Sequence, residues 1–138
     1  MQQYELEIRY LGQDQVELKE PKDVYHEMRD IKSWDREVFV VFCLDSRNRV
    51  VSREIVSVGT LNQSLVHPRD VFRAAIARNS NAVILSHNHP SGSIEPSPED
   101  DSATKKMLEA GELLHIPLLD HVIVTKEGYY SYSQNRRM

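Results

Sequence analysis

Two histidines separated by one residue, His87 and His89, are the residues of this 138-residue chain best placed to share a ligand. In an extended backbone, side chains two positions apart leave the same face, so both imidazoles can converge on one point. Neutral imidazole is a common zinc ligand, and a catalytic zinc takes three protein ligands and leaves a fourth position for water. A metal site built on this pair therefore needs a third ligand from elsewhere in the chain.

Acidic residues after the histidine pair could supply the third ligand, and they are Glu95, Glu99, Asp100 and Asp101. The turn-forming segment Pro90-Ser91-Gly92 allows the chain to fold back over the histidines. Asp100 would lie in the first turn of a helix that begins after Ser97, whereas Glu95 lies inside the loop. Asp101 would point about 100° around the helix from Asp100, so only one of these neighbours can face a metal ion. Spacing alone leaves the choice open.

The same segment also has the pattern of a helix start. Ser97 at the N-cap, Pro98 at the first helical position and Asp100 three residues after the cap form a capping box. A histidine pair near a strand end is also commonly hydrogen bonded without any metal. On residue types and spacing, a helix cap and a metal ligand therefore remain alternative roles for Asp100.

Hydrophobic periodicity places these residues in a mixed α/β domain. Apolar residues alternate over 4–10, as in a half-buried strand. They recur at helical spacing over 21–32 and 98–114, and in a third segment that begins at 68 and is ended by the polar residues 79–81. Strands 38–44 and 50–58 are expected to form a hairpin, and further strands are expected at 82–85, 116–124 and 129–132. The connection 86–97 holds both histidines and begins at a strand end. Connections of this length are commonly functional.

Composition excludes several other classes of protein. The chain has 17 Lys and Arg against 21 Asp and Glu, a formal net charge of -4, so no overall positive field attracts nucleic acid. The single cysteine, Cys43, lies in an apolar run and cannot form an internal disulfide. No segment reaches the roughly 18 consecutive apolar residues of a membrane span, and the first residues lack the pattern of a secretory signal. These features predict a cytoplasmic protein without a membrane partner.

The sequence ILSHNHPSG at 84–92, followed by PSPED at 96–100, resembles the JAMM metalloprotease motif in the form carried by RadC-like proteins of bacteria and archaea. Segments at 59–61 (GTL), 66–69 (VHPR), 110–111 (AG) and 119–121 (LDH) also resemble the RadC pattern. The resemblance covers most of the chain from about Trp34 to Tyr132. It implies a JAMM/MPN fold, a mixed β-sheet flanked by helices with the layout of cytidine deaminases. It assigns residues 34–138 to a RadC-like JAB/MPN domain. The strand and helix that periodicity predicts within 1–33 are expected to be part of the core or packed on it.

The resemblance, carried over residue by residue, implies that His87, His89 and Asp100 bind one zinc ion. It gives the Ser97 hydroxyl the role of stabilising the oxyanion of a tetrahedral intermediate. The catalytic glutamate of the family lies on an early strand before an apolar run, a position that Glu37 matches best, with Glu54 as the second candidate. His121 also belongs to the RadC pattern. It is expected either near the site, supporting a ligand or contacting substrate, or in the core as a structural histidine.

The implied activity is zinc-dependent hydrolysis of peptide or isopeptide bonds in a peptide or protein substrate. Zinc lowers the pKa of its bound water toward 7, and a nearby carboxylate carries the proton to the leaving amine.

The alternative is a DNA-repair-associated RadC module that acts on nucleic acid without protease activity, supported only by small groups of arginines at 47–53, 69–78 and 136–137. Fuller RadC proteins carry an N-terminal helix-hairpin-helix region, whereas about 35 residues precede the core here, which disfavours DNA binding. A non-catalytic MPN scaffold ranks third, because every motif position is filled.

Overall fold

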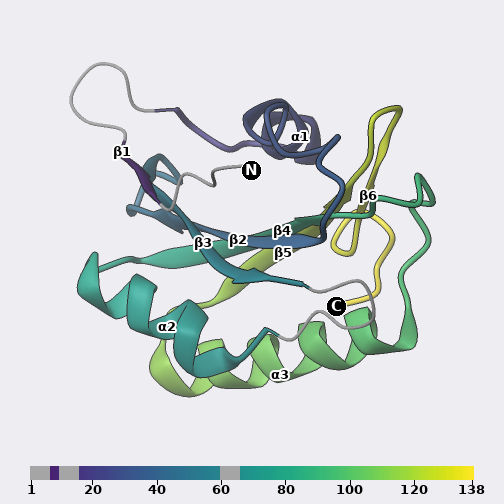
Figure 1. Cartoon of the computed structure of the whole chain (residues 1–138). Coiled ribbons are helices and arrows are strands. Elements are labelled where there is room, and N and C mark those ends of the chain that lie inside the picture. Colours follow the sequence, from purple (N-terminus) through teal and green to yellow (C-terminus); the bar gives the residue numbers. More distant parts are fainter. Residues whose placement is uncertain (1–6, 10–15, 60–65) are drawn as a thin grey trace.

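A six-stranded sheet between two helical layers forms the core of the structure (Figure 1). The computed structural model describes residues 7–9, 16–59 and 66–138, so the ends of the predicted strand at 4–10 and most of the GTL segment lie outside the described residues. The helices are α1 (Pro21–Glu27), α2 (Pro68–Ala77) and α3 (Pro98–Leu114). The strands are β1 (Glu7–Arg9), β2 (Val38–Leu44), β3 (Val50–Val58), β4 (Ala82–Asn88), β5 (Leu118–Val124) and β6 (Tyr129–Ser131). None of the helices in the described ranges is long and apolar enough to cross a membrane.

The strands follow the order β1-β3-β2-β4-β5-β6 across the sheet. Helix α1 covers one face, and α2 and α3 cover the other (Figure 1). Strand β4 pairs with β5 in parallel, because the crossover helix α3 returns the chain to the same end of the sheet, whereas β2 pairs with both β3 and β4 antiparallel. The predicted fold class, a mixed β-sheet flanked by helices, is confirmed, and it is consistent with a JAB/MPN domain.

The two central strands, β2 and β4, are buried along their whole length. Alternate side chains of β2 face opposite layers: Val38 and Val40 pack in the core that includes Val24 of α1. Phe39 and Val41 pack in the core that α2 and α3 cover. A strand buried on both faces needs apolar residues at every position, which explains the continuous hydrophobic run of β2.

The antiparallel pairing of β2 with β4 brings the start of one strand beside the end of the other. Phe39, near the start of β2, lies opposite His87, near the end of β4. Residues just before β2 and just after β4 therefore meet at one edge of the sheet. Asp100, in the first turn of α3, reaches the same edge, because its carboxylate lies 3.2 Å from the His87 ring.

Four elements differ from their predicted lengths. Strand β6 ends at Ser131 rather than at residue 132. Helix α1 ends at Glu27 rather than Lys32, because Arg53 donates hydrogen bonds to the Glu27 carbonyl oxygen and to the Asp30 carboxylate and so holds the chain in the turns that follow the helix. Strand β4 continues past residue 85 to Asn88, pairing with β5 up to Val124. Strand β5 begins at residue 118 rather than 116. The last residues of β4 are polar, so the apolar pattern does not reveal that the strand extends through His87, the first histidine of the pair.

Candidate metal centre

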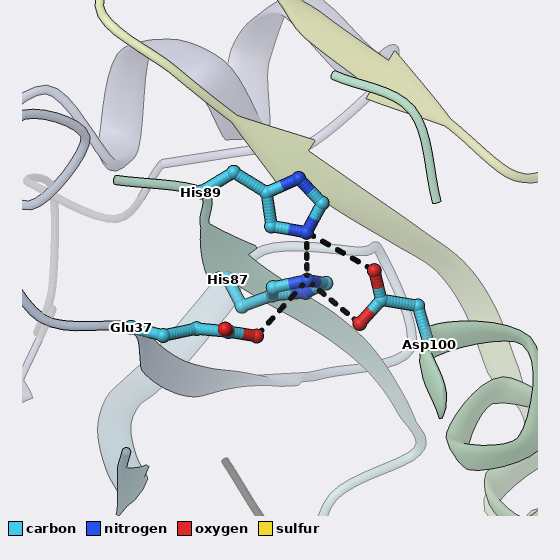
Figure 2. Close-up of side chains that lie close together, drawn as sticks. All are labelled: Glu37, His87, His89 and Asp100. Atoms are coloured by element: carbon cyan, nitrogen blue, oxygen red, sulfur yellow. Dashed lines mark hydrogen bonds and ion pairs between the residues drawn. The ribbon is translucent and has the colours of Figure 1, made fainter. Parts of the chain in front are cut away.

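Four side chains converge where β2 begins and β4 ends (Figure 2). His87 lies near the end of β4, His89 directly follows the strand, Asp100 lies in the first turn of α3, and Glu37 directly precedes β2. One ligand atom from each residue lies within 4.8 Å of those of the other three. The extended backbone at 87–89 therefore brings both imidazoles to one point, together with two carboxylates.

Three of these groups form a tight triangle. The Nε2 atom of His87 lies 3.0 Å from Nε2 of His89 and 3.2 Å from Oδ1 of Asp100, and Nε2 of His89 lies 3.0 Å from Oδ2 of Asp100. Ligand atoms placed about 2.05 Å from a zinc ion at tetrahedral angles stand about 3.3 Å apart. These spacings, measured to the two oxygens of one Asp100 carboxylate, are thus close to those between the ligand atoms of a tetrahedral zinc ion.

Hydrogen bonds on the far side of each ring show which nitrogen carries the proton. Nδ1 of His89 lies 2.7 Å from the Ser93 carbonyl oxygen, so it is this nitrogen that donates. Nδ1 of His87 lies 2.7 Å from Nε2 of His121 and donates to it. When both rings are neutral, the two Nε2 atoms direct lone pairs at each other and at the Asp100 carboxylate. Acceptors at this spacing repel one another unless a proton or a metal cation lies among them, so the donor set fits a metal ion.

His121 and Thr104 determine the proton position on His87. The Thr104 hydroxyl donates to the Asp100 carbonyl oxygen at 2.8 Å and therefore accepts from Nδ1 of His121 at 2.6 Å. Nε2 of His121 is then an acceptor for Nδ1 of His87. His121 is fully buried, and burial together with the nearby His87 holds its pKa well below the usual value, which keeps the ring neutral.

These contacts decide among the roles left open for His121. Its burial excludes direct contact with a substrate in solution, and its hydrogen bonds make it a support for His87. Thr104 was missed in the sequence analysis. The available signal was its spacing of four residues from Asp100, which places both on one face of α3.

Asp100 serves the helix cap and the cluster together. Its Oδ2 atom accepts from the Ser97 N–H at 2.9 Å, and its own N–H donates to Ser97 Oγ at 3.0 Å, which completes the capping box. Burial would raise the pKa of Asp100, but the adjacent His87 and His89 outweigh it and hold this pKa far below the usual range. In return, and against the effect of burial, Asp100 raises the pKa of His89. The helix cap is therefore present, and the same carboxylate faces both histidines, where it could also bind a metal ion.

The other acidic candidates for the third ligand lie outside the cluster. Glu95 and Glu99 are exposed. Asp101 accepts hydrogen bonds from the Tyr132 hydroxyl and from Arg137. Of the four candidates, only Asp100 faces the histidine pair.

Glu37 stands slightly apart from the triangle. Its Oε1 atom lies 3.6 Å from Nε2 of His87, and its side chain is 27% exposed, so it borders both the cluster and solvent. Burial, reinforced by the charge of Asp100 and opposed by His87, raises the pKa of Glu37. The second candidate for the catalytic glutamate, Glu54, instead accepts a hydrogen bond from Ser52 and pairs with Arg78. Of the two, only Glu37 reaches the cluster.

Ser97 adjoins the cluster through Asp100 and is not one of the four converging residues. Its oxygen accepts the Asp100 N–H, which leaves the hydroxyl proton available to donate. The N-terminus of α3 adds the positive end of a helix dipole at this place. A developing negative charge near Ser97 would therefore be stabilised.

A cleft with a volume of about 420 Å³ adjoins His89 and is lined by segments 32–35, 89–92 and 125–127. Gly92 has a φ of 88°, a conformation that favours glycine, and its N–H donates to the His89 carbonyl oxygen. This turn returns the chain so that the Ser93 carbonyl meets Nδ1 of His89. The loop therefore orients His89 and forms one wall of a space large enough for a ligand.

Comparison with known proteins assigns the chain to a family. A family model described as RadC-like JAB domain matches residues 18–137. The chain belongs to the RadC-like JAB domain family. A UPF0758 protein of Methanosarcina barkeri is 47% identical to this RadC-like JAB domain over 112 residues, which are 80% of this chain and 49% of that protein. A UPF0758 protein of Thermotoga maritima is 45% identical over 111 residues (80% and 50% of the two chains), and one of Chlorobium phaeovibrioides is 40% identical over 132 residues (95% and 59%).

The RadC-like JAB domain spans about half the length of the curated relatives it matches, and the names of those relatives state no activity. Several arginines on which the nucleic-acid alternative depended are paired with carboxylates in the structure. The pairs are Arg49 with Asp45, Arg53 with Asp30, Arg78 with Glu54 and Arg137 with Asp101. This pairing removes much of the local positive charge that phosphate binding would use.

Proposed function

We propose that this RadC-like JAB domain is a zinc-dependent hydrolase of peptide or isopeptide bonds. The observation that carries the proposal is the triangle of acceptors from His87, His89 and Asp100, held 3.0 to 3.2 Å apart. Two imidazoles and one carboxylate are a ligand set that catalytic zinc uses, with a further position left for the reacting groups. The choice of an amide substrate rests on the resemblance to JAMM metalloproteases.

The side chains around the triangle supply the other parts of a hydrolytic mechanism. Zinc bound there would polarise a carbonyl group and lower the pKa of a water molecule toward 7. Glu37 accepts the proton of the attacking water and returns it to the leaving amine nitrogen, a role supported by its distance of 3.6 Å from His87 and its raised pKa. The Ser97 hydroxyl donates to the developing oxyanion, supported by the N-terminus of α3.

Metal analysis of the purified protein tests the centre. We expect about one equivalent of zinc per chain, set by the three-ligand triangle. Asp100→Ala removes one ligand and should lose the metal, whereas His26→Ala, which changes a histidine outside the cluster, should retain it. A wild-type protein that binds no zinc, or an Asp100→Ala variant that keeps it, contradicts the proposed centre.

Hydrolysis of peptide libraries and of isopeptide-linked peptides tests the activity. We expect Glu37→Gln to retain zinc and the fold while its rate falls by about 100-fold or more, because the substitution removes a proton carrier rather than a ligand. Glu54→Gln is the matched control and should remain active. Full activity in Glu37→Gln would contradict its proton-transfer role. A zinc-loaded wild type that cleaves no amide substrate would instead favour a non-catalytic MPN scaffold.

A further inference from the structure

The side chain of Asn88, the residue between the two histidines, is fully buried. Three hydrogen bonds join it to one segment, residues 34–38. It accepts from the Val38 N–H at 2.7 Å and donates to the carbonyl oxygens of Arg36 at 2.8 Å and Trp34 at 3.3 Å. Both amide protons are thereby used, and the partners fix which end of the amide is oxygen.

The Asn88 side chain binds the backbone of segment 34–38, which the main-chain pairing of β2 with β4 does not reach. That pairing ends at Phe39 and His87, so residues before Phe39 make no main-chain ladder with β4. Glu37 lies between the bonded carbonyl of Arg36 and the bonded N–H of Val38. Its own carbonyl oxygen accepts from the Gly59 N–H at 2.7 Å. The backbone of Glu37 is therefore held on both sides by one side chain of β4.

We infer that Asn88 is a positioning residue that holds Glu37 at a set distance from His87 and His89. The inference rests on the proposed function, because it concerns the group assigned to proton transfer. The backbone at the end of β4 determines the positions of the His87 and His89 imidazoles. Through the hydrogen bonds of Asn88, it also determines the position of the Glu37 carboxylate. A proton carrier must lie within hydrogen-bond reach of its partner, and a displacement of about 1 Å can cost about 100-fold in rate.

Two substitutions separate this role from folding. Asn88→Asp preserves the volume and the acceptor for the Val38 N–H, but an ionised carboxylate cannot donate to the carbonyls of Arg36 and Trp34. Asn88→Ala removes all three bonds and serves as the second variant. Ser52→Ala is the matched control, because Ser52 is buried in β3 and its hydroxyl donates to Glu54 rather than to segment 34–38.

Kinetics on a cleaved peptide give the first reading. We expect all variants to bind zinc as the wild type does, and kcat of Asn88→Asp to fall about 10- to 100-fold with little change in KM. Ser52→Ala should stay within about twofold of the wild type. The double variant Asn88→Asp/Glu37→Gln should be no slower than Glu37→Gln alone, because both changes remove the same function. Losses that multiply in the double variant overturn the inference.

Two further readings need no substrate. The visible absorption of Co²⁺ bound by the protein is recorded between pH 5 and 9. Its pH dependence should differ between Glu37→Gln and the wild type, and Asn88→Asp should show the same difference. In metal-free protein, the Gly59 amide should exchange with solvent at least about tenfold faster in Asn88→Asp than in the wild type and in Ser52→Ala. A wild-type Co²⁺ spectrum or unchanged Gly59 exchange in Asn88→Asp overturns the inference. Failure of the wild type to bind Co²⁺ counts against the proposed metal centre, and the exchange measurement then decides the role of Asn88 alone.

Discussion

The Nδ1 atom of His87 and the Nε2 atom of His121 lie 2.7 Å apart, on the side of the His87 ring opposite the Nε2 atom that faces Asp100. This contact belongs to a closed circuit that begins and ends on one residue. The Asp100 carbonyl binds Thr104, Thr104 binds His121, His121 binds His87, and His87 returns to the Asp100 carboxylate. The circuit ties α3, β5 and β4 together and sets the direction of the His87 lone pair.

His121→Leu should therefore weaken zinc binding without removing any ligand. The substitution leaves Nδ1 of His87 without its acceptor, so the ring loses the bond that fixes its proton and orientation. Loss of such a support typically costs about 10- to 100-fold in metal affinity. Competition with a chromophoric chelator measures the affinity.

Two variants control for this effect. Thr104→Val breaks the circuit one bond further out and should weaken zinc binding less than His121→Leu does. His26→Leu changes a histidine outside the cluster and should leave the affinity unchanged. A folded His121→Leu protein with wild-type zinc affinity would show that His87 needs no such support.

Ser97→Ala should lower the free energy of unfolding of the metal-free protein by about 1 kcal/mol, because the Asp100 N–H loses its capping acceptor. Denaturant unfolding measures this change. Zinc content should remain near one equivalent, while the hydrolytic rate falls through loss of the hydroxyl donor. Ser102→Ala, at an exposed position within α3, is the control for both readings. An unchanged unfolding free energy in Ser97→Ala would contradict the role of the cap.

The parts of the fold that were predictable are those set by local patterns. A strand buried on both faces, such as β2, is apolar throughout, and its length was predicted correctly at 38–44. The end of β4 was missed because His87 and Asn88 are polar and their burial depends on distant partners. Residue spacing left Asp100 among four acidic candidates, and the family resemblance was needed to choose it. The role of Asn88 could not be recognised, because its partners are brought to it only by the folded chain. For Thr104 the spacing of four residues from Asp100 was visible in the sequence, but its contact with His121 was not.

Gly111→Ala should destabilise the protein although alanine favours helix. A Cβ atom at this position would lie 2.6 Å from the Ile116 carbonyl oxygen and 3.3 Å from the Phe72 ring, because the chain leaving α3 crosses close to its last turn. Overpacking of this kind costs about 1–3 kcal/mol, which exceeds the helix-propensity gain of about 1 kcal/mol. Thermal and denaturant unfolding test this expectation, with Ser102→Ala as the helical control. Equal or higher stability in Gly111→Ala would show that the 116–118 segment can move aside.

Asp30→Asn should lower stability at neutral pH and have little effect in acid. Arg53 is 4% exposed and donates hydrogen bonds to both oxygens of Asp30, which is 49% exposed. Burial would raise the pKa of Asp30, but the Arg53 hydrogen bonds and charge outweigh it and lower this pKa. A carboxyl whose pKa is lowered by folding stabilises the protein fully above its unfolded pKa of about 3.9, and this contribution is lost as the pH falls through the folded value.

The expected loss of unfolding free energy in Asp30→Asn is about 1 kcal/mol at pH 7, since exposure of Asp30 to water weakens the ion pair. The difference from the wild type should shrink progressively below pH 4, because the wild-type carboxyl is then protonated as well. Urea unfolding at pH 7, 5 and 3 measures the difference, and Glu112→Gln at an exposed position of α3 supplies the control. A difference that stays constant or grows in acid would contradict the lowered pKa, and it would mean that Asp30 acts through packing instead of charge.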